Sequence, residues 1–157
     1  MTDAHAGKPY RRNAGAVVLN AEGKVLVGWK HGTWQLPQGG VDDGETFADA
    51  LVRELSEEIG TDLFSVLRAS EQEFCYDWPG PVKKHKECYR GQRQRYFLVR
   101  FEGRDSDLAP HLHGEFTKVC WLTPAEVLAH AWEVKRPIYH AVLREFGLVA
   151  REDDAPA

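Results

Sequence analysis

Residues 39–60 read GGVDDGETFADALVRELSEEIG, and this stretch decides the fold. If its second half is helical, Glu54, Glu57 and Glu58 lie three and four residues apart and share one face. Carboxylates at that spacing repel one another and weaken a helix by about a few tenths of a kcal/mol per pair. Such a conflict between a sequence and its own local stability is expected at a functional site.

Ordinary signals mark the two ends of this helix. Thr46 can cap it, so the helix is predicted to run from about Phe47 to Ile59, with Gly60 as its C-terminal stop. Its apolar residues form one stripe, namely Phe47, Leu51, Leu55 and Ile59. On a wheel of about 100° per residue, the first and third of the three glutamates border this stripe, and the second lies just beyond them.

A hard cation would cancel the repulsion between these carboxylates. Mg²⁺ and Mn²⁺ take oxygen ligands, and Mg²⁺ commonly sits among carboxylates, waters and substrate phosphates. The alternative is an ordinary solvated helix, because acidic clusters are frequent on helix surfaces. A merely solvated helix would place its carboxylates away from the buried stripe, so a divalent-metal site becomes the working hypothesis.

Length and composition indicate a single globular domain. The chain has 157 residues, of which 43% are hydrophobic and 28% charged, with a net charge of −4. We expect a flexible N-terminal end over residues 1–9, one domain over residues 10–150 and a flexible acidic tail over residues 151–157. The N-terminus is polar, and no apolar run approaches the roughly 20 residues of a membrane span, so we expect a cytoplasmic protein without a membrane partner.

The cysteines give little support to a disulfide framework or a zinc site. They are three in number and far apart: Cys75, Cys88 and Cys120. This pattern favours reduced thiols in a cytoplasm. A zinc site that combines them with His85, His111 or His113 is conceivable, but the spacing differs from that of the common structural sites.

Strand-like and helix-like segments interleave along the chain without a strict alternation. The apolar runs at 15–20 and 24–29 read as a hairpin, and 71–78 and 95–101 read as further strands. Two more helices are predicted over 123–131 and 136–147. The pattern therefore predicts a mixed sheet with helices on both faces.

Residues 39–61 also resemble a known motif, the Nudix box, G-x5-E-x7-R-E-U-x-E-E-x-G-U, in which U is a bulky aliphatic residue. Eight of its fixed positions are matched, by Gly39, Glu45, Arg53, Glu54, Leu55, Glu57, Glu58 and Gly60. Thr61 occupies the final aliphatic position, a departure that concerns local packing and no chemistry.

The resemblance implies an α/β/α sandwich and metal-dependent cleavage of a nucleoside diphosphate linked to another group. It implies Mg²⁺ as cofactor, with Mn²⁺ as the alternative ion, held by Glu54, Glu57 and Glu58 and by the backbone carbonyl of Gly39. Arg53, counted with the catalytic set, would pair with Glu45 and brace the loop against the helix. Such pairing fixes ligand geometry from outside the ligand set.

Four further segments extend the likeness over nearly the whole chain: YRRNAG at 10–15, WQLPQGG at 34–40, GQRQRYFLVR at 91–100 and EVKRPIYHAVLREFG at 133–147. They are similar to the Nudix branch that contains bacterial RNA pyrophosphohydrolases and plant-type dinucleoside tetraphosphate hydrolases. This branch uses an additional glutamate after the basic strand. Glu115 stands at that position and is expected to be a metal ligand or the base that activates water.

Seven Lys or Arg residues lie between Lys83 and Arg100, against the single acidic residue Glu87. Such a run is usually a solvated face. The resemblance gives it another purpose, because a polyphosphate substrate carries charge that metal ions neutralise only in part. The expected substrate-binding residues are Arg11, Gln38, Gln92, Gln94, Arg95, Lys135 and Tyr139; the guanidinium of Arg95 suits phosphate oxygens, and Tyr139 is one of several stacking platforms, with Tyr76 and Trp78.

The expected reaction is attack of a metal-activated water on one phosphorus of a polyphosphate chain. The main hypothesis is removal of pyrophosphate from RNA 5′-triphosphate ends, which leaves a 5′-monophosphate. The alternatives are asymmetric cleavage of a dinucleoside tetraphosphate (Ap4A) and hydrolysis of damaged nucleoside triphosphates. A non-catalytic nucleotide-binding module is a fourth hypothesis, and the intact glutamate set argues against it. We infer no stable protein partner.

Overall fold

The computed structural model describes residues 7–80, 86–110 and 115–150. The predictions for residues 1–6 and 151–157, and those for His85, His111 and His113, concern residues outside these ranges. The elements, in chain order, are β1 Tyr10–Leu19, β2 Val25–Lys30, β3 Thr33–Gln35, β4 Gln38–Gly40, α1 Phe47–Ile59, β5 Phe64–Asp77, β6 Gly91–Phe101, η2 Asp105–Asp107, β7 Val119–Leu122, α2 Pro124–His130 and α3 Arg136–Glu145.

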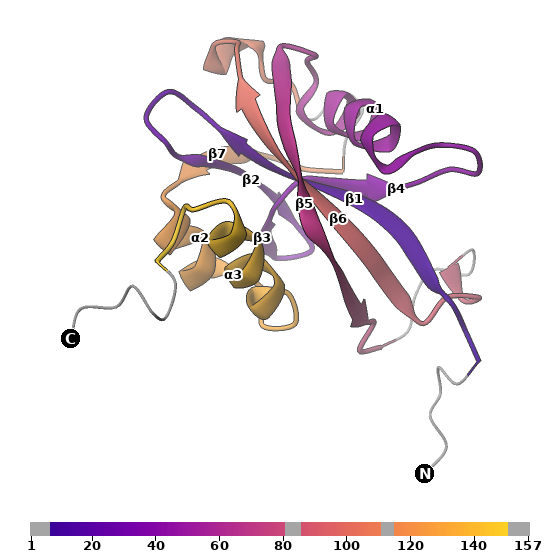
Figure 1. Cartoon of the computed structure of the whole chain (residues 1–157). Helices are drawn as coiled ribbons and strands as arrows, with labels where there is room; N and C mark the ends of the chain where they lie inside the picture. Colours follow the sequence, from indigo (N-terminus) through magenta and orange to yellow (C-terminus); the bar gives the residue numbers. More distant parts are fainter. Residues whose placement is uncertain (1–6, 81–85, 111–114, 151–157) are drawn as a thin grey trace, which may run out of the picture.

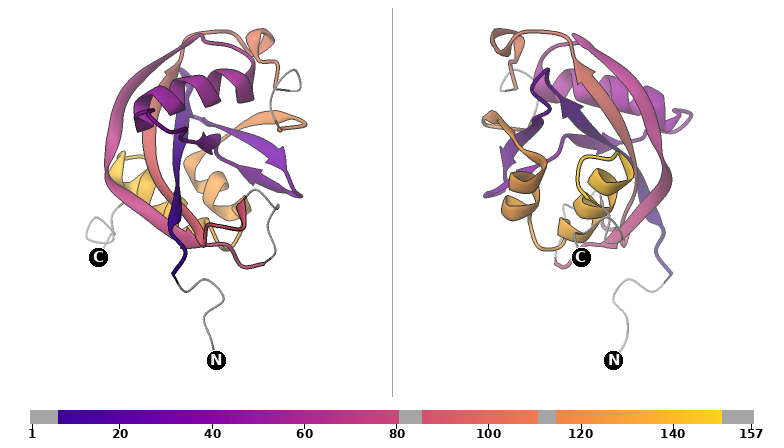
Figure 2. Two further views of the ribbon diagram at one scale, coloured as in Figure 1. Left: turned by 90° about the vertical axis from the view of Figure 1, so that its right-hand side faces the viewer. Right: turned by 60° about the vertical axis from the view of Figure 1, so that its left-hand side comes forward.

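A seven-stranded mixed sheet forms the middle layer of the molecule. Its strand order is β3-β2-β1-β6-β5, while β4 also pairs with β1 and β7 with β2. The β1–β6 pair is parallel and the other pairs are antiparallel. α1 covers one face of the sheet, and α2 and α3 cover the other (Figures 1 and 2). The prediction of a mixed sheet between helices is therefore confirmed.

Two hydrophobic clusters join the layers. On one face, Leu51, Leu55 and Ile59 of α1 pack against side chains of β1, β2 and β6. On the other face, residues of α3 such as Tyr139 and Leu143 pack against β1, β2 and Tyr96 of β6. Successive residues of a strand point to opposite faces, so each central strand contributes to both clusters.

The helix α1 has the bounds that its sequence predicts. The Thr46 side chain accepts a hydrogen bond from the backbone N–H of Asp49 at 3.1 Å, which satisfies one of the free donors of the first turn. At the other end Gly60 adopts a left-handed conformation with φ of 74°, and its N–H bonds to the carbonyl of Ser56. Both ends of the helix are thus fixed by local chemistry.

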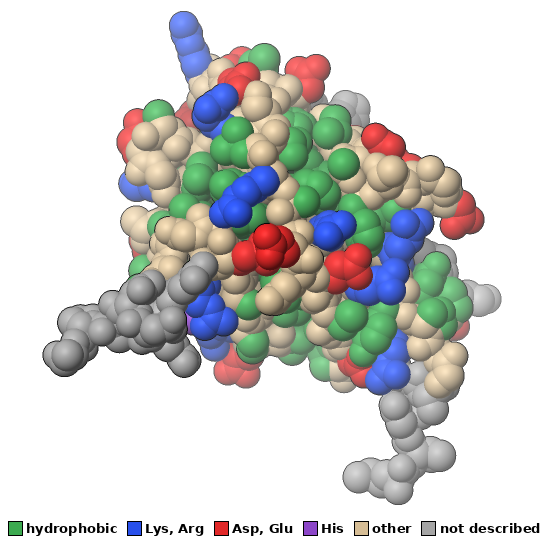
Figure 3. All heavy atoms as spheres, in the orientation of Figure 1, with side chains coloured by type: hydrophobic (Ala, Val, Ile, Leu, Met, Phe, Trp, Pro, Cys, Tyr) green, Lys and Arg blue, Asp and Glu red, His purple; other side chains and the backbone are tan. Residues whose placement is uncertain are grey.

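β5 forms the sheet edge farthest from β3. Basic, acidic and hydrophobic side chains are interspersed on the face that Figure 3 shows, where β5 lies in front. The carboxylate of Glu145 in α3 accepts hydrogen bonds from the backbone N–H groups of Glu71 and Gln72, so part of this edge is covered from within the chain. None of the described helices combines the length and apolar character that crossing a membrane requires.

Replacement of Gly60 by alanine should destabilise the protein strongly. A side chain in the left-handed region costs about 1–2 kcal/mol, and a Cβ at Gly60 would also overlap the carbonyl oxygen of Ala109. Gly23→Ala is the matched control, because Gly23 has a φ of 75° and open surroundings. Urea unfolding should show a loss of about 2–5 kcal/mol for Gly60→Ala and about 1–2 kcal/mol for Gly23→Ala. Equal losses would refute the close packing of this turn.

Candidate active site

Arg53 ties the loop between β4 and α1 to the helix. Its Nε and one terminal nitrogen donate to the two carboxylate oxygens of Glu45 at 2.9 and 2.7 Å, so the predicted pairing is present. The same guanidinium also donates to the carbonyl of Gly40 at 3.0 Å and to Glu54 at 2.7 Å. The hydrogen bonds from Arg53 lower the pKa of Glu45 to about 2, so this carboxylate stays charged. The brace holds the loop at a fixed distance from the helix.

Gly39 lies where a side chain would not fit. It belongs to β4, which pairs with β1 so that Gly39 stands opposite Ala14. A Cβ at Gly39 would overlap the carboxylate of Glu54. The absence of a side chain therefore lets the backbone of β4 approach a glutamate of α1, as a site that combines a carbonyl and carboxylates requires.

Glu58 is a buried carboxylate, with 6% of its surface exposed. Burial raises its pKa to about 8; the nearby charges of Glu54 and Glu115 add to the effect, whereas Lys30 and the backbone N–H of Gln38 oppose it. That N–H donates to Glu58 Oε2 at 3.2 Å. A carboxylate held in this way needs a proton or a cation when the cavity is closed to water.

Glu115 comes from the segment before β7 and lines the same cavity as the three glutamates of α1. Its carboxylate forms an ion pair with Lys30, the last residue of β2. Gly28, two residues earlier in β2, contacts Phe116, and a Cβ at Gly28 would overlap that ring. Sequence reasoning missed Lys30; a basic residue directly after the second apolar run of the predicted hairpin was the available signal.

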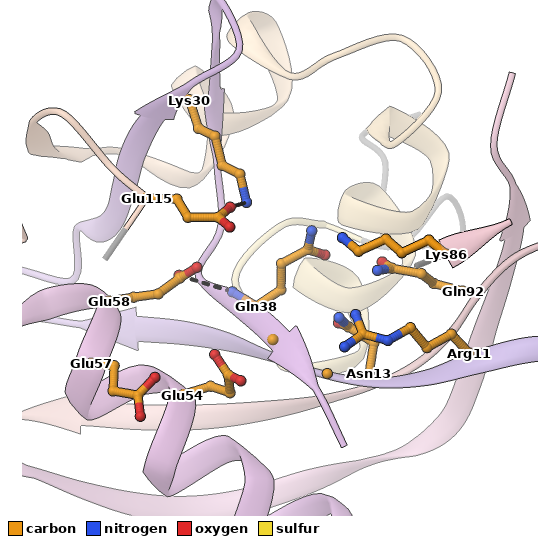
Figure 4. A pocket seen from close by; sticks show the side chains of 12 residues that line it. Arg11, Asn13, Lys30, Gln38, Glu54, Glu57, Glu58, Lys86, Gln92 and Glu115 are labelled. Carbon is orange, nitrogen blue, oxygen red and sulfur yellow. Dashed lines mark hydrogen bonds and ion pairs between the residues drawn. The ribbon is translucent and has the colours of Figure 1, made fainter. Parts of the chain in front are cut away.

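A cavity of about 250 Å³ lies between α1 and the beginning of β6. Its walls differ in charge: the four glutamates lie on one side, and Arg11, Lys86 and Gln92 lie across from them (Figure 4). Its lining residues are Arg11, Asn13, Lys30, Gln38, Gly39, Gly40, Glu54, Glu57, Glu58, Lys86, Gln92 and Glu115. Such a cavity can hold cations against one wall and the oxygens of an anionic ligand against the other.

A second cavity of about 320 Å³ adjoins the first and shares five of its lining residues, Lys30, Gln38, Lys86, Gln92 and Glu115. Three aromatic side chains, those of Tyr76, Trp78 and Trp132, also line it. Sequence reasoning proposed the first two as stacking platforms and missed Trp132, which lies in the turn between α2 and α3. The pair of cavities offers a charged part and an aromatic part that adjoin each other.

Three of the expected substrate-binding residues line neither cavity, namely Gln94, Arg95 and Tyr139. Arg95 lies on the opposite face of β6 from Gln92 and Gln94, and its Nε donates to the carbonyl of Ser70 at 3.1 Å. Grouping Arg95 with the two glutamines is therefore corrected, because alternate residues of a strand face opposite ways. Tyr139 has 1% of its surface exposed, and its hydroxyl accepts from the N–H of Leu36, so it is a core residue.

Lys135 and Gln94 are buried polar residues; Lys135 also lines the second cavity, whereas Gln94 lines neither. Lys135 is 2% exposed, and burial lowers its pKa to about 7, with Lys30 adding to the effect. Its ammonium donates to the side-chain oxygens of Gln38 and Gln94 at 2.8 and 3.0 Å. The structure thus brings three of the predicted substrate-binding residues into one hydrogen-bonded group.

The donor set at the first cavity fits a hard divalent ion. It consists of the carboxylates of α1, the carboxylate of Glu115 and the Gly39 carbonyl, all oxygen atoms, which Mg²⁺ and Mn²⁺ prefer. Within the described ranges, no three His, Cys, Asp or Glu side chains already stand close enough together to hold an ion. Like charges keep these glutamates apart, so the set would have to close around a cation.

The fold and this cavity together define a class of protein. A model of the NUDIX domain matches residues 9–142, which is most of the chain. The chain therefore belongs to the Nudix family and is a hydrolase of that family.

Named relatives narrow the comparison. An RNA pyrophosphohydrolase of Novosphingobium aromaticivorans is 41% identical over 157 residues, which cover 93% of this chain and 98% of that protein. An RNA pyrophosphohydrolase of Acidiphilium cryptum is 41% identical over 165 residues, which cover 99% and 100%. Among solved structures, an Ap4A hydrolase of C. elegans in a binary complex is similar with a TM-score of 0.65 at 21% identity, over 87% of this chain and 95% of that one, a likeness of fold alone.

Without divalent metal, the stability of the protein should fall as the pH rises through the pKa of Glu58. The folded protein holds this proton more tightly than the unfolded chain, so the stabilisation is present below about pH 4.5 and is lost as the pH passes about 8. Glu58→Gln mimics the protonated form and should remove roughly 1–3 kcal/mol of this decline.

The measurement is urea unfolding between pH 5 and pH 9 in EDTA. Glu57→Gln is the control, since Glu57 is an exposed carboxylate of the same helix. The wild-type curve minus the Glu58→Gln curve isolates Glu58 from the other titrating groups. If the free energy of unfolding of the wild type and of Glu58→Gln changed with pH in the same way, Glu58 would not be a buried ionisable carboxylate.

Proposed function

We propose that this protein is an RNA pyrophosphohydrolase, which removes pyrophosphate from RNA 5′-triphosphate ends and leaves a 5′-monophosphate. The observation that carries the proposal is the division of one cavity into a carboxylate wall and a cationic wall, next to an aromatic cavity. The two relatives named RNA pyrophosphohydrolase support the choice of substrate, because the similarity covers nearly the whole length of this chain and of each relative.

Nudix hydrolases generally use divalent metal ions, and we propose Mg²⁺ for this chain, with Mn²⁺ as the alternative. The residues that would hold it are Glu54, Glu57 and Glu58, with Glu115 and the carbonyl of Gly39. When bound, the ion would lower the pKa of water and neutralise charge on the phosphate chain. Arg53 would not touch the substrate; it would keep Glu54 and the loop in position.

Glu115 is our choice for the group that accepts the proton of the attacking water. Its side chain is 59% exposed and lines both cavities, so it can reach a water beside a phosphate. Its ion pair with Lys30 holds the carboxylate beside both cavities. With substrate bound, Lys30 would lie beside the phosphate chain and add its positive charge to that of the metal ion.

The remaining charge of the polyphosphate would meet the opposite wall. Arg11 and Lys86 supply cations there, and Gln92 supplies an amide. The first nucleoside would enter the second cavity, against Tyr76, Trp78 and Trp132, where a base can stack on aromatic side chains. These groups contact phosphate and the face of a base, so they carry little information about sequence.

A second candidate is asymmetric cleavage of dinucleoside tetraphosphates. The observation in its favour is the adjoining pair of cavities, which suits any nucleoside joined to a long phosphate chain. An assay of triphosphorylated RNA, diadenosine tetraphosphate and a dNTP side by side with Mg²⁺ decides between them. We expect the highest kcat/KM on the RNA; a preference for either other substrate by tenfold or more would overturn the main proposal.

Glu57→Gln should abolish turnover on the preferred substrate, because a neutral amide is a far weaker ligand for a hard cation. Stability without metal should stay the same or rise, since repulsion on α1 is relieved. Glu22→Gln, in the turn between β1 and β2, is the matched control and should keep wild-type rates. Near-normal turnover by Glu57→Gln at ordinary Mg²⁺ would falsify the metal site.

Glu115→Gln should lower kcat by about 10²- to 10⁴-fold and leave the KM for triphosphorylated RNA nearly unchanged. The reason is that a base acts on the water in the transition state and holds little of the substrate. Steady-state kinetics at saturating Mg²⁺ separates the two constants. An unchanged kcat would return Glu115 to an ordinary loop carboxylate.

A further inference from the structure

Lys135 is a buried cation whose donors are already engaged. An ammonium group has three N–H donors. The three described acceptors around Nζ are the side-chain oxygen of Gln38 at 2.8 Å, that of Gln94 at 3.0 Å and the hydroxyl of Tyr96 at 3.5 Å. With 2% of the residue exposed, a phosphate oxygen could bond to Nζ only by displacing one of these partners.

The shape of the surrounding core also holds the lysine in place. Nζ lies 4.7 Å from the ring centroid of Tyr76 and 5.5 Å from that of Tyr139, so two aromatic faces stabilise its charge. The backbone of Lys135 stands at the start of α3, where its N–H bonds to the carbonyl of Trp132 at 2.9 Å. The lysine is therefore anchored at both of its ends.

Gln38 connects this lysine to the glutamates. Its side-chain oxygen accepts from Lys135 and also from the Nε2 of Gln94, which itself bonds to Asn13. These two donors fix the side-chain oxygen of Gln38, a residue that lines both cavities. Its backbone N–H donates to Glu58 Oε2 at 3.2 Å, and the next residue in β4 is Gly39.

We infer that Lys135 is a positioning residue, which through Gln38 holds β4 and Glu58 in the arrangement that binds the divalent ion. Its contribution is to the metal site rather than to the phosphates of the substrate. This inference rests on the proposed hydrolase function. It replaces the expectation that Lys135 binds the substrate with a role that its buried contacts support.

Lys135→Met tests this role, because methionine keeps the length of the side chain and removes the donors. The affinity of the whole protein for Mn²⁺ is measured by electron paramagnetic resonance in the absence of substrate, and it should fall about tenfold. Losses of this size are typical when a residue that supports metal ligands from outside the ligand set is replaced. The kcat on triphosphorylated RNA should fall by about tenfold or more, with KM changed less than about twofold. Tm should stay the same or rise, since an apolar side chain replaces a buried charge.

Lys86→Met is the matched control, because Lys86 lines both cavities and is only partly buried. It should raise KM and leave Mn²⁺ affinity unchanged. If Lys135→Met behaves in the same way, Lys135 contacts phosphate and the inference is wrong. If the wild-type protein itself binds no Mn²⁺, the proposed function is wrong. If the wild-type protein binds Mn²⁺ and Lys135→Met binds it equally well, only the role of Lys135 is wrong.

A double-mutant cycle tests the route through Gln38. Gln38→Met removes the shared acceptor, so it should weaken Mn²⁺ binding by itself, and Lys135→Met added to it should cause little further loss. If Lys135→Met folds poorly, Gln38→Met alone still tests whether this group of hydrogen bonds supports the metal site. Losses that simply add would show that the lysine does not act through Gln38.

Discussion

The bidentate ion pair between Arg53 and Glu45 is the interaction on which the rest of the site depends. A single guanidinium joins the carboxylate of Glu45 in the β4–α1 loop, the carbonyl of Gly40 in β4 and Glu54 of α1. The pairing of β4 with β1 positions Gly39 in the sheet, and this contact ties the end of β4 and the loop after it to the helix. Because an arginine fork matches a carboxylate in two hydrogen bonds, this contact fixes direction as well as distance. It also holds Glu54 where the missing side chain of Gly39 allows a close approach.

From this brace the site extends in two directions. Towards α1, it gathers carboxylates that disfavour one another, and the burial of Glu58 makes the cost highest there. Towards the sheet, a set of amides and one buried lysine supports β4 from below. The hydrogen-bonded support beneath β4 complements the repulsion between the carboxylates on α1. Carboxylates that repel one another must be held by their surroundings until a cation binds.

The parts of the site that could be predicted from the sequence are the local ones. The bounds of α1 follow from Thr46 and Gly60, whose capping chemistry acts over one turn, and the hairpin of β1 and β2 follows from two short apolar runs close together in the sequence. The glutamates could be found because their spacing conflicts with helix stability. The match to the Nudix box made the identification of the family specific.

The remaining features depend on contacts between distant segments. The parallel pairing of β1 with β6 brings Asn13 beside Gln94, 81 residues later, and no local signal indicates that pairing. The lining by Trp132 depends on how α2 and α3 pack. That Arg95 points to the opposite face of the sheet from Gln94 could have been predicted, because adjacent residues of a strand point to opposite faces. The number of basic residues in this segment drew attention to its charge instead.

The central claim is that the carboxylates of α1 and the carbonyl of Gly39 form one site for a divalent ion. Anomalous diffraction from crystals grown with Mn²⁺ tests it most directly, because the signal locates the ion without reference to activity. The account predicts a peak at about 2.1 Å from carboxylate oxygens of α1 and from the carbonyl oxygen of Gly39. A peak held elsewhere, or ordered carboxylates with no ion at high Mn²⁺, would contradict it.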